Sequence, residues 1–137
     1  MAGDQYSIDG LAVPEGIEVL HDLLERVAAE HPGLPTADVM MFETAVMELA
    51  GNVVEHGRPS GEVRWHFELA VLSDALEARL SDSGEEYAAQ WSDTMPDELA
   101  ESGRGLPLAS AVLDELHFAR TSEVNVWTMV RRYQPQE

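Results

Sequence analysis

Hydrophobic residues recur at helical spacing in two stretches of the N-terminal half of the chain. The first begins at Pro14, a residue suited to the first turn of a helix, and stops at the sequence HPG at 31–33. The second stretch ends just before Gly57, the expected C-terminal cap. The apolar positions of the first stretch are Ile17, Leu20, Leu23, Leu24 and Val27. We therefore predict helices over 14–30 and 37–56.

Alternating polar and apolar residues predict strands in much of the remaining chain. The clearest case is EVRWHFELAVL, in which Val63, Trp65, Phe67 and Leu69 share one face. A turn at 73–75 leads from it into the next strand, and Ser122–Glu123 joins the last two strands. The predicted strands cover 5–13, 62–72, 75–80, 117–121 and 124–133. A third helix is expected from Leu106 to Leu116.

This order of segments predicts one α+β domain over residues 1–137. We expect a two-layer sandwich: a mostly antiparallel mixed sheet with helices near 14–30, 37–56 and 105–116 packed on one face. Residues 82–104 form a long polar loop in this interpretation. Because so long a loop is unusual in a compact domain, we expect it to be functional or mobile.

Composition excludes several functions. The formal net charge is −18, which argues against a nucleic-acid or anionic-membrane surface, because phosphate contacts need clustered basic residues. All eight basic residues are arginines, so a lysine-containing phosphate loop and a Schiff-base lysine are excluded. The lack of cysteine excludes disulfides and zinc–thiolate sites. The N-terminus has no secretory-signal pattern and no run spans a membrane, so a cytoplasmic location is expected.

The segment ETAVMELAGNVVEHG, residues 43–57, is the first candidate for chemistry. Glu48 and Asn52 are four residues apart and project from one face of the predicted helix. Asn52 is unfavourable inside a helix, and Gly51 weakens a helix by roughly 1 kcal/mol relative to Ala. Two such neighbours suggest the close approach of another group. The alternative is a solvated polar face.

Two further segments could bind a ligand. Asp82 in SDSGEEY follows a strand directly, and an ionised carboxylate there could accept a hydrogen bond from an exocyclic amine. The alternative for this segment is an ordinary turn. In SGRGL, Gly103 and Gly105 flank Arg104 before a helix, so backbone N–H groups there could bind a phosphate. The alternative is a flexible helix start.

Taken in order, these segments resemble the GHKL ATPase superfamily with its Bergerat nucleotide fold, and within it the anti-sigma-factor serine kinases. MELAGNVVEHG is similar to the N box, DSG to the first glycine box and SGRGLPLASAVLDEL to the second. VNVWTMVRR is similar to the closing strand, and the resemblance spans about residues 7–133.

The resemblance implies a site for ATP and Mg²⁺. In such a site Asn52 would bind the metal, Glu48 would be the general base, and Asp82 would accept the adenine amino group beside Gly84. The residues implied to surround the phosphates in a mobile lid are Gly103, Arg104, Gly105 and Leu106. Thr128 is implied to add a contact near adenine.

The function implied is phosphorylation of a serine or threonine of an anti-anti-sigma partner, together with sequestration of a sigma factor. Neither nucleic acid nor membrane is an expected partner, and a homodimer is left open. Two features depart from the family pattern: Glu85 and Glu86 follow the DSG motif, and the glycine common before the closing strand is missing near Glu123–Val124. The alternative is therefore a non-catalytic nucleotide-binding module that acts only by protein–protein contact.

Overall fold

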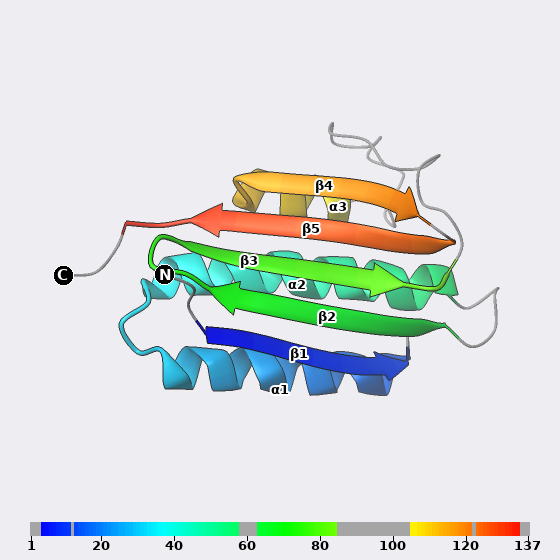
Figure 1. Cartoon of the computed structure of the whole chain (residues 1–137), viewed down its shortest axis with the longest axis horizontal. Helices are drawn as coiled ribbons and strands as arrows, with labels where there is room; N and C mark the ends of the chain where they lie inside the picture. The colour runs from blue at the N-terminus through cyan, green and yellow to red at the C-terminus, as the bar shows by residue number, and fades with distance from the viewer. Residues whose placement is uncertain (1–3, 12, 58–62, 85–104, 122, 135–137) are drawn as a thin grey trace.

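Five antiparallel strands form one sheet, and three helices cover one of its faces in the computed structural model of the protein (Figure 1). The structure describes residues 4–11, 13–57, 63–84, 105–121 and 123–134. The elements along these residues are β1 (Asp4–Leu11), α1 (Pro14–Glu30), α2 (Thr36–Gly57), β2 (Arg64–Val71), β3 (Ala75–Asp82), α3 (Gly105–Val112), β4 (Glu115–Thr121) and β5 (Val124–Arg132). The strand order across the sheet is β1-β2-β3-β5-β4.

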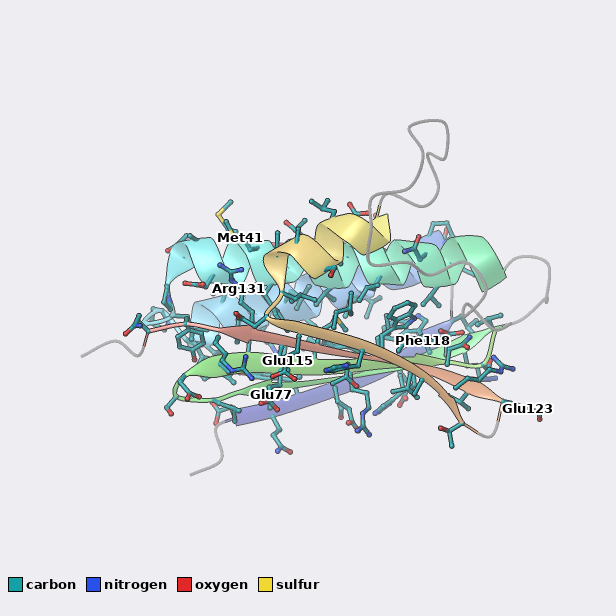
Figure 2. The ribbon with its side chains drawn as sticks, turned by 90° about the horizontal axis from the view of Figure 1, so that it is seen from above. Met41, Glu77, Glu115, Phe118, Glu123 and Arg131 are labelled. Carbon is teal, nitrogen blue, oxygen red and sulfur yellow. The ribbon has the colours of Figure 1, made fainter. Side chains whose placement is uncertain are left out.

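The predicted two-layer α+β architecture is confirmed, and Figure 2 shows the helices gathered on one side of the sheet. Most predicted boundaries agree with the structure within two residues. All four strand pairings in the described ranges are antiparallel, so the expected mixed sheet shows no parallel pair there.

The predicted end of the third helix at Leu116 is wrong, because α3 ends at Val112 and β4 begins at Glu115. Asp114 explains the change. Its backbone N–H donates to the carbonyl of Val130 at 2.8 Å, and its carboxylate accepts the backbone N–H of Arg132 at 2.5 Å. These bonds to β5 turn the chain from helix into strand.

The core lies between the sheet and the helices. The central strands β2 and β3 alternate buried and exposed residues, as a sheet covered on one face requires. The uncovered face carries polar side chains such as Glu77 and Arg79. The largest fully buried side chains are Trp127, Phe42, Phe67, Leu20, Leu49, Leu80 and Met129. Within the described ranges, none of the helices combines the length and the hydrophobicity needed to span a membrane.

Trp65 fixes the connection between β1 and α1. Its indole Nε1 donates to the carbonyl of Leu11 at 2.7 Å. Gly10 lies directly opposite on β1, and a Cβ added there would come within 2.7 Å of the indole ring. A Cβ added at Gly16 on α1 would lie 2.4 Å from the Leu11 carbonyl oxygen. Both glycines are therefore required by close packing around one tryptophan.

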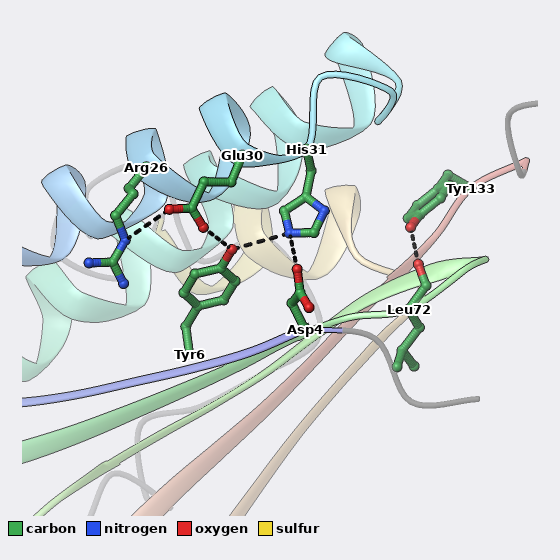
Figure 3. A network of polar contacts seen from close by, with 7 residues as sticks. All are labelled: Asp4, Tyr6, Arg26, Glu30, His31, Leu72 and Tyr133. Carbon is green, nitrogen blue, oxygen red and sulfur yellow. Dashed lines mark hydrogen bonds and ion pairs between the residues drawn. The ribbon is translucent and has the colours of Figure 1, made fainter.

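A polar network at the other end of β1 joins this edge strand to the end of α1 (Figure 3). The Tyr6 hydroxyl donates to Glu30 at 2.5 Å and lies 3.1 Å from His31 Nε2, which is also 3.1 Å from the Asp4 carboxylate. The guanidinium of Arg26 lies 5.4 Å from the centre of the Tyr6 ring. Desolvation and the hydrogen bond to Glu30 raise the pKa of Tyr6 to about 12.

The two helical glycines Gly16 and Gly51 provide a matched test of this packing. A Cβ at Gly51 meets no described atom within 4 Å, whereas one at Gly16 meets the Leu11 carbonyl. Gly16→Ala should lower the free energy of unfolding by about 1–3 kcal/mol, as overpacking does. Gly51→Ala should raise it by about 1 kcal/mol through helix propensity. Urea unfolding of both variants measures this, and a loss of stability for Gly51→Ala would contradict it.

His66 on the uncovered face gives the stability a pH dependence. Its Nδ1 bonds to Asp9 of the edge strand and its Nε2 lies 3.1 Å from Glu68. The hydrogen bond to Asp9, then that to Glu68, raises the pKa of His66 above its usual value of about 6.5. A raised histidine pKa stabilises the fold below the unfolded-state pKa, and this contribution is lost as the pH rises through the folded-state pKa.

We therefore expect the contribution of His66 to the free energy of unfolding to fall as the pH rises above about 6.5. The variant His66→Gln should lack this pH-dependent contribution. Asp9→Asn should remove most of the same contribution, because it takes away the largest cause of the shift. Urea unfolding at a series of pH values measures the slopes. Parallel profiles for the original chain and His66→Gln would refute this assignment.

Candidate functional site

The polar residues of the candidate site come from elements that meet at one end of the molecule. The C-terminal ends of α2 and β3 and the start of β5 all lie at the right-hand end in Figure 1. Helix α3 packs along α2, so its first turn belongs to the same layer. Helix α2, which carries Glu48 and Asn52, therefore neighbours both β3 and α3.

Asp82 is a carboxylate buried at the end of β3, with 2% of its surface exposed. It faces the helices because it follows the buried residues Ala78 and Leu80 at strand spacing. Its Oδ1 accepts the backbone N–H of Gly84 at 2.8 Å and the side-chain Nδ2 of Asn125 at 3.1 Å. These two donors hold the carboxylate in one orientation.

Gly84 is required by Asp82 itself. A Cβ added at Gly84 would lie 2.9 Å from Asp82 Oδ1 and 3.6 Å from Val63. The hydrogen bond from the Gly84 N–H to Asp82 draws the backbone this close to the carboxylate. The resemblance implies that Gly84 lies beside the adenine, and the structure adds this contact within the protein.

Asn125 and Arg120 extend the cluster, and the sequence analysis missed both. Asn125 is fully buried on β5 directly opposite Asp82, and its Nδ2 also lies 3.3 Å from the Gly84 carbonyl. Arg120 on β4 donates from Nη1 to Asn125 Oδ1 at 2.9 Å and to the Gly84 carbonyl at 3.0 Å. A sequence signal for Asn125 does exist. It precedes Trp127 and Met129 at alternate positions of β5, so it is a polar residue on the buried face of the strand.

Glu48 and Asn52 lie one turn apart on α2, as predicted. Asn52 is buried, with 7% of its surface exposed, whereas Glu48 is half-buried. The amide oxygen of Asn52 is a hard oxygen ligand of the kind that Mg²⁺ accepts, together with the phosphates of a nucleotide. Glu48 has the partial exposure that a base needs to meet a hydroxyl from another protein.

Thr128 is not brought together with the other predicted residues. It pairs directly with Arg79 on β3 and His117 on β4, whose side chains are exposed. It lines an open groove of about 580 Å³ on the uncovered face of the sheet, together with Arg79 and Glu77. Directly paired residues share a face, so Thr128 lies on the opposite face from Asp82. The expected contact of Thr128 near adenine gains no support from this placement, and Asn125 is the β5 residue beside Asp82.

The predicted lid is described only at its end. Gly105 and Leu106 form the start of α3. Gly103 and Arg104 lie outside the described residues, and so do Glu85, Glu86 and the expected mobility of the lid.

Residues 12–131 match the family model of the histidine kinase-like ATPase domain, and the chain therefore belongs to this family.

Two known proteins are similar to this chain along most of its length. The chain is 28% identical to the serine-protein kinase RsbW of Bacillus licheniformis, in an alignment that covers 91% of this chain and 84% of the relative. It is also similar to the crystal structure of the RsbU and RsbW domains of Rv1364c from Mycobacterium tuberculosis, with a TM-score of 0.70 and 19% identity. That match covers 98% of this chain but only 34% of the solved one, and it concerns the fold. The predicted resemblance to the anti-sigma-factor serine kinases is thus confirmed.

Proposed function

We propose that the chain is an ATP- and Mg²⁺-dependent protein-serine/threonine kinase that phosphorylates an anti-anti-sigma protein and sequesters a sigma factor. Membership of the ATPase family supports nucleotide binding, and similarity to the serine-protein kinase RsbW supports the kinase reaction. The observation that carries the nucleotide site is the buried Asp82 carboxylate, held by two donors at the end of β3. In this proposal residues 1–137 act as one domain in the cytoplasm.

Adenine is recognised by Asp82 in this proposal. An ionised carboxylate can only accept hydrogen bonds, so it suits the exocyclic amine of adenine and repels the carbonyl oxygen that guanine has at the same position. The two donors on Oδ1 fix the carboxylate before a nucleotide arrives. A fixed group loses little conformational freedom on binding, which favours affinity.

The phosphates bind toward α2 and the start of α3. Asn52 would hold Mg²⁺, and the residues assigned to the phosphates are Gly103, Arg104, Gly105 and Leu106. Bound ATP–Mg supplies the phosphoryl group to be transferred. This arrangement needs no lysine, because the metal and backbone N–H groups neutralise the triphosphate.

Glu48 acts as the general base. It lies one helical turn before Asn52 and is partly exposed, so it can meet a hydroxyl of a bound partner. It takes the proton from that serine or threonine while the hydroxyl oxygen attacks the γ-phosphorus and ADP leaves. Phosphoryl transfer depends mainly on positioning and charge stabilisation, so one well-placed base is sufficient.

One feature of the sequence favours an alternative to the kinase function. Glu85 and Glu86 follow the DSG motif directly, and two carboxylates near a triphosphate would repel it. The alternative is a nucleotide-binding module that regulates its partners by contact alone.

Asp82→Asn should weaken ATP binding more than tenfold. The amide can present an N–H group to the adenine amine, and the loss of a charge-assisted hydrogen bond typically corresponds to about 1.5–3 kcal/mol. The matched control is Asp74→Asn in the exposed β2–β3 turn, which should leave the affinity unchanged. Calorimetric titration with ATP–Mg measures both, with melting curves to show that each variant is folded. Equal affinities for the two variants would place the adenine site elsewhere.

Glu48→Gln should keep ATP and partner binding but slow phosphoryl transfer by ~10²–10⁴. The matched control is Glu43→Gln on the same helix. Glu43 is also half-buried, and burial raises its pKa, but it lies near His21 and Glu25 of α1. Single-turnover transfer from labelled ATP to candidate anti-anti-sigma domains from the same genome measures the rates.

Three results of this experiment are distinguishable. Slow transfer by Glu48→Gln alone supports the general base. Equal rates for the original chain and Glu48→Gln would show that another group takes the proton. If the original chain binds ATP and its partner but transfers no phosphate, the non-catalytic module replaces the kinase.

A further inference from the structure

Arg120 is a charged side chain that reaches the candidate site from the far edge of the sheet. It lies on β4, directly opposite Asn125, and two residues beyond Phe118 on the same face of the strand. Phe118 packs against the buried Trp127 at a ring distance of 4.6 Å, which identifies this face as the one covered by helices. Arg120 is accordingly part-buried on this side of the sheet.

The contacts of Arg120 determine the orientation of the Asn125 amide. A guanidinium only donates hydrogen bonds, so its contact at 2.9 Å must be with the amide oxygen of Asn125. The amide nitrogen then faces two acceptors, Asp82 Oδ1 at 3.1 Å and the Gly84 carbonyl at 3.3 Å. Arg120 therefore reinforces the orientation in which Asn125 donates to the carboxylate.

Arg120 also holds the backbone that follows β3. The same Nη1 donates to the Gly84 carbonyl at 3.0 Å, while the Gly84 N–H donates to Asp82 at 2.8 Å. Arg120 thus binds the carbonyl of Gly84, and Asp82 binds its N–H. A lysine would not reach the same point, because its ammonium nitrogen lies one bond closer to the backbone than Nη1 does.

We propose that Arg120 is a positioning residue for adenine recognition, a proposal that rests on the nucleotide site proposed above. By holding Asn125 and the Gly84 carbonyl, it keeps donors on Oδ1 of Asp82 and fixes the carboxylate in one orientation. Without it, Asn125 and residue 84 can move, and the Asp82 carboxylate can turn away from the orientation that accepts the adenine amine. The specific consequence is a loss of discrimination between adenine, which presents a donor, and guanine, which presents an acceptor at the same ring position.

The test compares ATP and GTP binding to the full chain carrying Arg120→Met or the control Arg79→Met. Arg79 is an exposed arginine on the uncovered face of the same sheet. For Arg120→Met we expect ATP affinity to fall about tenfold while GTP affinity falls less, so that the preference for ATP shrinks. Arg79→Met should leave both affinities and their ratio unchanged. Titrations are made well below the melting temperature of each variant.

A double-mutant cycle with Asp82→Asn tests whether Arg120 acts through the carboxylate. If it does, adding Arg120→Met to Asp82→Asn should change ATP affinity by less than about twofold. If Arg120→Met alone does not fold, Arg120→Lys is measured in the same way. It keeps the charge but should still lower the ATP preference.

Each outcome decides between the two proposals. If the original chain binds no ATP, the proposed nucleotide site fails and this inference fails with it. If the original chain binds ATP and Asp82→Asn weakens it, but Arg120→Met leaves the ratio of ATP to GTP affinity unchanged, Arg120 has no role in recognition. Equal losses for ATP and GTP would show that Arg120 only stabilises the fold.

Discussion

The candidate site depends on one row of cross-strand neighbours that crosses the whole sheet on its helix-facing side. Gly10, Trp65, Asp82, Asn125 and Arg120 are paired in that order from β1 to β4. At one end Trp65 fixes the start of α1, and at the other the polar residues bond to one another. A buried carboxylate in such a row needs hydrogen-bond donors, and here Asn125 of the neighbouring strand and the backbone N–H of Gly84 provide them. A register slip of one residue would place Asp82 on the uncovered face and separate its carboxylate from Asn125.

Much of the fold could be predicted because its periodicities are strong. Helix α1 buries one stripe, and β2 and β3 alternate cleanly, so their positions follow from local sequence. The end of α3 did not follow, because Leu113 and Leu116 fit a helical stripe as well as they fit the turn and strand that form. The deciding bonds of Asp114 are to Val130 and Arg132, and periodicity carries no information about partners so distant in the chain.

The residues of the candidate site also fall into those that the local sequence reveals and those that it does not. Asp82 and Gly84 form a local motif that the sequence displays, whereas Asn125 meets Asp82 across 43 positions of the chain. Thr128 was assigned to the right strand, but it is three positions from Asn125, and an odd shift along a strand changes the face. The glycine that is common before the closing strand of the family is missing before β5. Glu123 there adopts φ 66°, a left-handed conformation that costs a residue other than glycine roughly 1–2 kcal/mol. The turn thus keeps a geometry suited to glycine with another residue in place.

Two arginines on the helix-facing side of the sheet have different partners. Arg120 joins β4, β5 and residue 84 at the candidate site. Arg131 reaches from β5 toward α2 and α3 (Figure 2), where it bonds to Asp38 at 2.9 Å and to the carbonyl of Val112. The second contact ties down the C-terminal end of α3, the end away from Gly105. The proposed adenine side of the site is thus built into the sheet, whereas α3, which begins at Gly105, belongs to the helix layer and packs on α2.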